Sequence, residues 1–285
     1  MNLGKYLNEN YSKTSIKGYK NSINRFREVL GERSDTASYT DILDYIGILR
    51  EQKLHPKSVR NHLFAVKIYF NYLQETGKRK GHPCSELYLK DKINCQIQAE
   101  NLYPKEILQA LYETYQAKNQ SNQERDKIII SLLIYQALTV LEISQIKTGD
   151  IDLENGTIRI TGNTKNKGRT LSLKPNQILL LHHYLKSDRK KYLRKPTDYF
   201  LLNGQGLPLR PDGINRLING GKGRHEKLLP LKIRQSVIAH LLKENRDLRI
   251  VQEFAGHRRT SSTEAYRQTG LEELKSAIER LHPLQ

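Results

Sequence analysis

The stretch GTIRITGNTKNKGRTLSL, from Gly156 to Leu173, differs in period from the chain on either side of it. Apolar and polar residues alternate in GTIRITGN and again in RTLSL, which is typical of strands with one buried face. The segment between them, TKNKG, combines Asn and Gly, two residues that favour turns. The sequence therefore predicts a β-hairpin, with Lys165 and Lys167 in its turn.

Helical patterns surround this hairpin. Helices are expected from Pro104 to Lys118, from Glu124 to Leu138 and from Asn176 to Tyr192, followed by a short strand at YFLLN and more helices with Gly-rich breaks at NGQG and NGGKG. The polar segment NCQIQAENLYPKE leads into them, and Pro104 near its end favours a helix start. We expect a linker at residues 96–103 and a mainly helical α+β domain with a small sheet at residues 104–285.

The first 95 residues show the helical period alone. Apolar residues recur three or four positions apart from Thr14 to Leu30, from Thr40 to Gln52, and from Pro56 until near Gly77. No segment up to about residue 95 alternates as a strand does. Residues 1–95 are therefore expected to form a small all-helical domain.

The chain carries a formal net charge of +18. Residues 1–100 hold 17 Lys and Arg against 11 Asp and Glu, and the rest holds 31 against 19, so the excess is +6 in the first part and +12 in the second. A positive excess in both parts favours an extended polyanion as partner, and double-stranded DNA is the natural candidate. No apolar run reaches the ~18 residues of a spanning helix, and the N-terminus lacks a signal-peptide core, so a cytoplasmic protein without membrane contact is expected.

Several common chemistries have no matching pattern. The two cysteines, Cys84 and Cys95, are too few for a disulfide framework or a zinc cluster and are expected to be reduced thiols. The histidines show no H-E-x-x-H spacing, and the chain has neither G-x-x-x-x-G-K-[ST] nor G-x-S-x-G. No metal and no cofactor are expected.

The C-terminal third holds an ordered set of polar residues. Arg234 lies on the amphipathic segment PLKIRQSVIAHLLK, His257 follows a glycine, and Tyr266 comes nine residues after that histidine. This order resembles the catalytic core of the phage-integrase or Xer-type tyrosine recombinases, and FAGHRRTSSTEAY and GDIDLENGTIRI are its most specific pieces. The all-helical N-terminal part is similar to their core-binding domain, so the likeness spans nearly the whole chain.

The resemblance implies a reaction and a role for each residue. Tyr266 would attack a DNA phosphate and form a 3′-phosphotyrosyl link, Arg234 would clamp the phosphate, and His257 would hydrogen-bond to it. Lys165 would protonate the leaving 5′ oxygen, with Lys167 as the fallback. Phosphoryl transfer depends on positioning and charge stabilisation, which a planar, permanently charged guanidinium supplies well.

Two positions depart from the family pattern. Its first arginine aligns with Thr139, and the position three residues before Arg234, usually His or Lys, is Leu231. A one-turn shift would place Glu142 in the arginine position instead. Losing one charge-stabilising donor costs ~10²–10³ in rate. Lys232, His225, Arg224, Arg258 and Arg259 are candidates to replace the missing groups.

Each assignment has a structural alternative. Tyr266 could be a half-buried aromatic residue, Arg234 a solvated helix residue, His257 a satisfied histidine at a helix end and Lys165 a solvated turn residue. The basic runs are usually solvated faces, but here they are interpreted as DNA-phosphate contacts. The predicted contacts are Lys78, Arg79, Lys80, Lys167, Arg169, Lys222, Arg224, Lys232, Arg258 and Arg259.

The sequence thus predicts a site-specific DNA recombinase, an integrase or resolvase of a mobile element, acting as a homo-oligomer on DNA, with a tetramer expected and accessory DNA-binding proteins as further partners. The alternative is a recombinase-fold DNA-binding protein with impaired cleavage, serving as repressor, accessory or architectural factor. Thr139 and Leu231 favour the alternative, whereas the retained tyrosine, arginine, histidine and hairpin lysine favour the enzyme. The amphipathic segment LEELKSAIERLHPLQ packs on its own domain or, as the resemblance implies, on a neighbouring protomer. An RNA-binding helical protein has no supporting motif.

Overall fold

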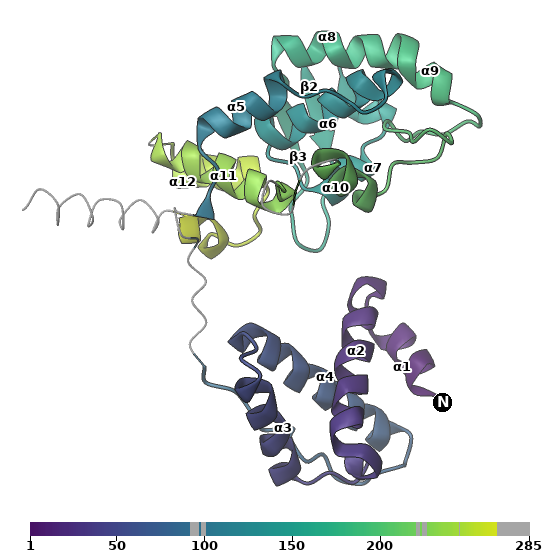
Figure 1. The fold of residues 1–285 in the computed structure, drawn as a ribbon, viewed down its shortest axis with the longest axis vertical. Helices are drawn as coiled ribbons and strands as arrows, with labels where there is room; N and C mark the ends of the chain where they lie inside the picture. The colour runs from purple at the N-terminus through teal and green to yellow at the C-terminus, as the bar shows by residue number, and fades with distance from the viewer. Residues whose placement is uncertain (92–96, 98–100, 221–222, 224–226, 245, 267–285) are drawn as a thin grey trace, which may run out of the picture. The chain divides into compact units, whose positions relative to one another are not determined.

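The computed structural model describes residues 1–91, 97, 101–220, 223, 227–244 and 246–266. The chain divides into two compact units, residues 1–94 and residues 95–285 (Figure 1). Each unit has its own hydrophobic core.

Within its described residues, 1–91, the first unit has four α-helices: α1 (Leu3–Asn10), α2 (Lys13–Leu30), α3 (Tyr39–Glu51) and α4 (Pro56–Glu75). A 3₁₀ turn at Gly31–Ser34 follows α2. The long helices form where the apolar period predicts them, and α4 has proline at its first position, where a missing N–H costs nothing. The first helix is not evident from the sequence, because Tyr6 and Leu7 are its buried residues and two adjacent positions give no period.

The second unit is also mainly helical. Its α-helices are α5 (Lys105–Glu113), α6 (Gln123–Tyr135), α7 (Val140–Gln145), α8 (Pro175–His183), α9 (Arg189–Tyr192), α10 (Pro211–Asn219), α11 (Pro230–Lys243) and α12 (Leu248–Ala255). Residues 261–266 are helical as well. Short 3₁₀ turns lie at Gln120–Asn122 and Thr148–Asp150. The helix expected from Asn176 to Tyr192 is α8 and α9 joined by a π-helical turn at Tyr184–Asp188.

A three-stranded antiparallel sheet accompanies these helices. Strands β2 (Thr157–Ile160) and β3 (Arg169–Ser172) form the predicted hairpin, with Ile158 opposite Leu171, and β1 (Ile151–Asp152) pairs with β2. The expected strand at YFLLN is wrong, because Tyr199 and Leu202 form single bridges to two different partners, Lys147 and Pro208. The fold class, mainly α with a small sheet, is confirmed.

Helix α6 lies at the centre of the second unit (Figure 1). Ile128, Ile129, Ile130, Leu132 and Leu133 are fully buried, so apolar residues cover this helix all round, as expected for a core element. A short loop leads from its C-terminal end into α7, and α5, α8 and α11 pack around it. Among the residues described, no helix combines the length and the apolar character that a bilayer crossing requires.

Candidate functional site

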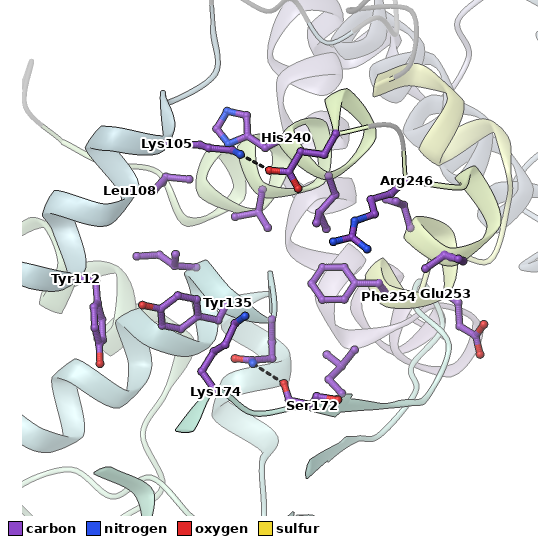
Figure 2. Close-up of a pocket in the computed structure, with 18 of the residues that line it drawn as sticks. Lys105, Leu108, Tyr112, Tyr135, Ser172, Lys174, His240, Arg246, Glu253 and Phe254 are labelled. Atoms are coloured by element: carbon purple, nitrogen blue, oxygen red, sulfur yellow. Dashed lines mark hydrogen bonds and ion pairs between the residues drawn. The ribbon is translucent and has the colours of Figure 1, made fainter. Parts of the chain in front are cut away.

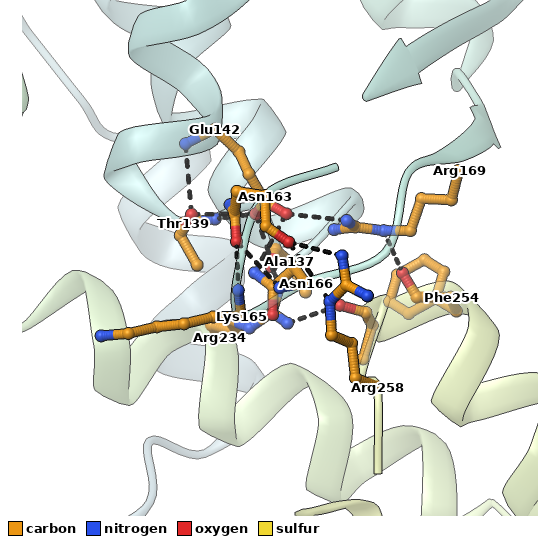
Figure 3. Close-up of polar contacts among 11 residues, drawn as sticks. Ala137, Thr139, Glu142, Asn163, Lys165, Asn166, Arg169, Arg234, Phe254 and Arg258 are labelled. Atoms are coloured by element: carbon orange, nitrogen blue, oxygen red, sulfur yellow. Dashed lines mark hydrogen bonds and ion pairs between the residues drawn. The ribbon is translucent and has the colours of Figure 1, made fainter. Parts of the chain in front are cut away.

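Segments far apart in the sequence meet at one place in the second unit. The start of α7, the β2–β3 turn, the middle of α11 and the loop after α12 contribute polar side chains there, and the end of α12 contributes backbone carbonyls (Figure 3). The helical segment 261–266, which carries Tyr266, packs against α11 and α12 through Ile238, Val251 and Ala255. The fold therefore brings the residues singled out in the C-terminal third together with the hairpin.

Glu142 is the centre of the polar network. Its Oε2 accepts hydrogen bonds from the backbone N–H of Thr139 (2.8 Å) and from the Thr139 hydroxyl (2.9 Å). Its Oε1 accepts from Arg169 Nη1 (2.7 Å) and from Asn166 Nδ2 (3.2 Å). Burial raises the pKa of this carboxyl, but the donors and the positive charges of Arg169 and Arg234 outweigh burial, so its pKa is lowered and it is an anion at neutral pH.

Arg234 is held inside the protein. Nη1 donates to the carbonyl of Ala137 and Nη2 to the carbonyl of Ala255, both at 2.5 Å, and Nη1 lies 3.8 Å from Glu142 Oε2. The residue is 4% exposed. Burial lowers the pKa of Arg234, and the charge of Glu142 opposes that shift. The anion next to Arg234 in this structure is the carboxylate of Glu142.

His257 and Tyr266 stack on each other. Their ring centroids are 6.1 Å apart and the ring planes are inclined by 15°. The Nδ1 atom of His257 lies 2.9 Å from Thr263 Oγ1. Burial, reinforced by the positive charges of Arg234 and Arg169, lowers the pKa of His257 to about 4, so the ring is neutral at pH 7. If Thr263 donates to Nδ1, then Nε2 carries the ring proton and is a donor for a phosphate oxygen.

Tyr266 is 8% exposed and lies among apolar side chains. Burial raises the pKa of its phenol, while the nearby charge of Arg234 and a hydrogen bond with the Gln235 side chain lower it in part. A neutral, shielded phenol is a weak nucleophile. In this structure the phenol of Tyr266 is thus shielded from solvent.

The hairpin turn is fastened to the loop after α12. Lys167 donates its backbone N–H to the carbonyl of Gly256 (2.8 Å), and Asn166 pairs with His257 in a single bridge. Lys165 is exposed and its backbone N–H donates to Asn163 Oδ1 (2.8 Å). Figure 3 shows the Lys165 side chain extending away from Glu142 and Arg169.

Other predicted DNA contacts lie at different places. Lys78 and Arg79 belong to the first unit, where they lie over the rings of Tyr72 and Phe70, and Lys80 is exposed there. Lys232 lies over the ring of Tyr103, with Nζ 4.4 Å from its centroid. Exposed in the second unit are Lys167, Arg258 and Arg259. Lys222, Arg224 and His225 lie outside the described residues.

Arg169 requires a correction. The sequence predicts a DNA contact, but the side chain is 3% exposed and its guanidinium donates to Glu142 and to the carbonyl of Phe254 (2.7 Å). A guanidinium enclosed in this way cannot reach a DNA backbone without breaking a buried ion pair. Arg169 is therefore an internal partner of Glu142.

The two departing positions have distinct surroundings. Thr139 is the N-cap of α7, and with Glu142 it forms a reciprocal capping box. Leu231 is 65% exposed on the first turn of α11. Neither side chain carries a charge for a phosphate. The sequence does not reveal that Glu142 accepts hydrogen bonds from several elements, or that Asn163, Asn166 and Thr263 hydrogen-bond within the site. It does show the T-x-x-E spacing from Thr139 to Glu142, which indicates a helix start.

A groove of about 960 Å³ opens beside this network. Figure 2 shows the rings of Tyr135 and Phe254 pointing into it, with Lys105, Lys174 and Arg246 among the charged residues around them. Arg169 and Phe254 line the groove and also belong to the polar network. The C-terminal helix expected at LEELKSAIERLHPLQ lies outside the described residues, so its packing stays a prediction.

Comparisons with known proteins agree with this fold. The chain is 29% identical over 289 residues to the tyrosine recombinase XerC of Oceanobacillus iheyensis, covering 97% of this chain and 92% of the relative. It is 27% identical to the tyrosine recombinase XerD of Listeria innocua, covering 95% of this chain and 93% of that protein.

Solved structures show the same fold. A XerH site-specific recombinase bound to a palindromic difH substrate superposes with a TM-score of 0.72 at 21% identity, covering 94% of this chain and 80% of the other. A lambda integrase dimer bound to a COC′ core site superposes with a TM-score of 0.60 at 12% identity. The match covers 94% of this chain and 96% of the other. The phage integrase family matches residues 100–272, and the N-terminal SAM-like domain of phage integrases matches residues 5–77. The chain therefore belongs to the phage integrase family and is a homologue of the tyrosine recombinases.

Proposed function

We propose that the protein is a site-specific DNA recombinase with Tyr266 as its nucleophile. The observation that carries the proposal is the stacking of Tyr266 on a neutral His257, in a site that also holds the buried Arg234. The positive excess in both parts of the chain supports DNA as substrate. The relatives named tyrosine recombinases support the same reaction class.

The proposed reaction proceeds by two transesterifications. The Tyr266 phenol loses its proton to solvent, Oη attacks the scissile phosphorus, the bond to the 5′ oxygen breaks, and Lys165 gives that oxygen a proton. The 5′-hydroxyl of a partner strand then returns a proton to Lys165 and attacks the 3′-phosphotyrosyl link, which releases Tyr266 to take up a proton from solvent. The number of phosphodiester bonds is unchanged, so no external energy source is needed.

Each remaining residue has a distinct part in this proposal. Neutral His257 donates from Nε2 to a phosphate oxygen. Arg234, anchored by the carbonyls of Ala137 and Ala255, contributes a fixed positive charge beneath the phosphate. Because Tyr266 is shielded, DNA binding has to draw the segment 261–266 outward, so cleavage depends on assembly at the site.

The proposal extends to the assembly. Residues 1–95 form a DNA-contacting domain linked by residues 96–103 to the catalytic domain, and Lys78, Arg79 and Lys80 contact phosphates. The protein acts as a tetramer bridging two duplexes for a mobile element, in the cytoplasm, with the C-terminal segment bound to a neighbouring protomer. The lambda integrase structure, a dimer on its core site, supports assembly on DNA.

A second candidate is a DNA-binding protein with impaired cleavage. Two observations favour it: Thr139 serves as a helix cap, and Leu231 is an exposed apolar side chain, so neither position offers a charge. Such a protein would bind a specific site and act as repressor, accessory or architectural factor.

A suicide substrate separates the two candidates. The protein's own site is selected from random duplexes, nicked beside the cleavage point and incubated with wild type, Tyr266→Phe and Tyr199→Phe. Tyr199 is a partly exposed tyrosine of the same unit and serves as the matched control. We expect a denaturant-resistant adduct with wild type and Tyr199→Phe and none with Tyr266→Phe. Specific binding without any adduct would favour the second candidate.

A further inference from the structure

The two guanidinium groups at the centre of the network face inward. Arg234 has both Nη atoms bound to backbone carbonyls and is 4% exposed, and the side chain of Arg169 is 3% exposed and paired with Glu142. A phosphate approaching from solvent therefore contacts neither of these two guanidinium groups directly. A further charged donor at the surface of the site would hold the phosphate oxygens more strongly than neutral donors do.

Arg258 has the right exposure and a fixed position. It follows His257 directly, its residue is exposed, and its Nε (3.2 Å) and Nη2 (2.7 Å) both donate to the carbonyl of Asn163. In the part of the chain that the structure describes, Nη1 has no acceptor, so that edge of the guanidinium is available to a ligand.

The carbonyl that holds Arg258 belongs to the turn that carries the candidate general acid. Asn163 Oδ1 accepts the backbone N–H groups of Lys165 and Asn166, both at 2.8 Å. Arg258 and Lys165 are thus both hydrogen-bonded to Asn163 of this turn (Figure 3). A single bound phosphate contacting both would receive two positive charges from the same surface.

The same turn also reaches the position that lacks an arginine. Asn166 donates to Glu142, and Glu142 in turn binds the backbone and hydroxyl of Thr139. The turn therefore bridges the loop containing His257 and the start of α7. Arg258 is thus connected to Thr139 through the Asn163–Asn166 turn and Glu142.

We propose that Arg258 contacts the scissile phosphate and supplies the charge that Thr139 does not. The inference rests on the proposed recombinase function and names one more residue of its site. The turn holds one edge of the guanidinium through Asn163, and the free edge donates to the nonbridging phosphate oxygens as negative charge develops.

The test measures adduct formation with two nicked substrates, one with the natural scissile phosphate and one with a methylphosphonate there. A methylphosphonate carries no negative charge, so a residue that neutralises the phosphate becomes dispensable. Arg258→Ala is compared with Arg258→Lys and with the control Arg249→Ala, which removes an exposed arginine of α12. Circular dichroism and binding of the uncleaved site show that the variants are folded.

We expect Arg258→Ala to form the adduct ~10²–10³ slower on the phosphate substrate and less than about tenfold slower on the methylphosphonate. Arg258→Lys should lie between, because an ammonium keeps the charge but loses the fork. An Arg258→Ala rate equal to that of Arg249→Ala, or an equal loss on both substrates, would overturn the role. If wild type forms no adduct, the proposed function itself is wrong and the inference fails with it. That result differs from slow adduct formation by Arg258→Ala alone, which leaves the proposed function intact.

Discussion

Arg169 donates to Glu142 at 2.7 Å although 27 residues separate them, and both side chains are almost completely buried. The pair fastens the start of β3 to α7. Arg169 also holds the carbonyl of Phe254 at the end of α12, so three elements of the site are joined by one guanidinium.

Replacement of Glu142 by Gln should destabilise the second unit strongly. The variant leaves Arg169 and Arg234 as buried cations without their carboxylate, and breaking a buried pair costs about 3–5 kcal/mol. Urea unfolding followed by circular dichroism measures the loss. The control is Glu9→Gln in the exposed pair with Lys5, expected to change the free energy of unfolding by less than about 1 kcal/mol. Equal small losses in both variants would show that the buried pair contributes nothing.

Thr139→Ala should cost about 1–2 kcal/mol of stability through loss of the N-cap of α7. Ser38→Ala is the matched variant, because Ser38 and Asp41 form the same reciprocal box at the start of α3. Thermal unfolding of both variants gives the comparison. If Thr139 acts as a cap and not in phosphate binding, Thr139→Ala keeps the wild-type rate of adduct formation once folded. A rate loss much larger than the stability loss explains would assign Thr139 a direct part in the chemistry.

Gly256→Ala should be destabilising and should disturb the site. Gly256 has φ +71° at the end of α12, and an added Cβ would lie 2.7 Å from Arg169 Nη1 and 3.0 Å from the carbonyl oxygen of Lys167. The left-handed backbone alone costs a non-glycine residue about 1–2 kcal/mol, before any displacement of Arg169. Gly47→Ala in α3 is the opposite control: an added Cβ meets no atom within 4 Å there, and alanine should stabilise that helix by about 1 kcal/mol. If Gly256→Ala left the free energy of unfolding unchanged, the loop would have to relax without cost.

The sequence predicts the long elements because their side chains repeat a burial pattern. Helices α2 and α4 show the 3.6-residue period, and β2 and β3 alternate on either side of their turn. The two-residue strand β1 is missed, since two residues cannot show alternation. The strand expected at YFLLN is wrong because consecutive buried residues such as Phe200 and Leu201 also occur in irregular core segments.

The sequence predicts several residues of the candidate site and their order along the chain, but not which of their neighbours they contact. Arg234, His257 and Tyr266 follow one another at a recognisable spacing, and the structure does bring them together. The Glu142–Arg169 pair depends on how the hairpin packs on α7, which no local pattern encodes. For the same reason the sequence assigns Arg169 to the DNA surface, where a basic residue in a basic turn is most often found.

The stability of the protein should fall as the pH decreases from about 6.5 to about 4, partly because of His257. Burial and the charges of Arg234 and Arg169 lower the pKa of His257 to about 4, against 6.5 when unfolded, so the unfolded chain takes up the proton first. The effect is absent above pH 6.5 and complete below pH 4, on the order of 3 kcal/mol. In His257→Gln, the free energy of unfolding measured with urea should decrease less over that pH range. Parallel curves for the two proteins would mean that His257 is solvated and titrates normally.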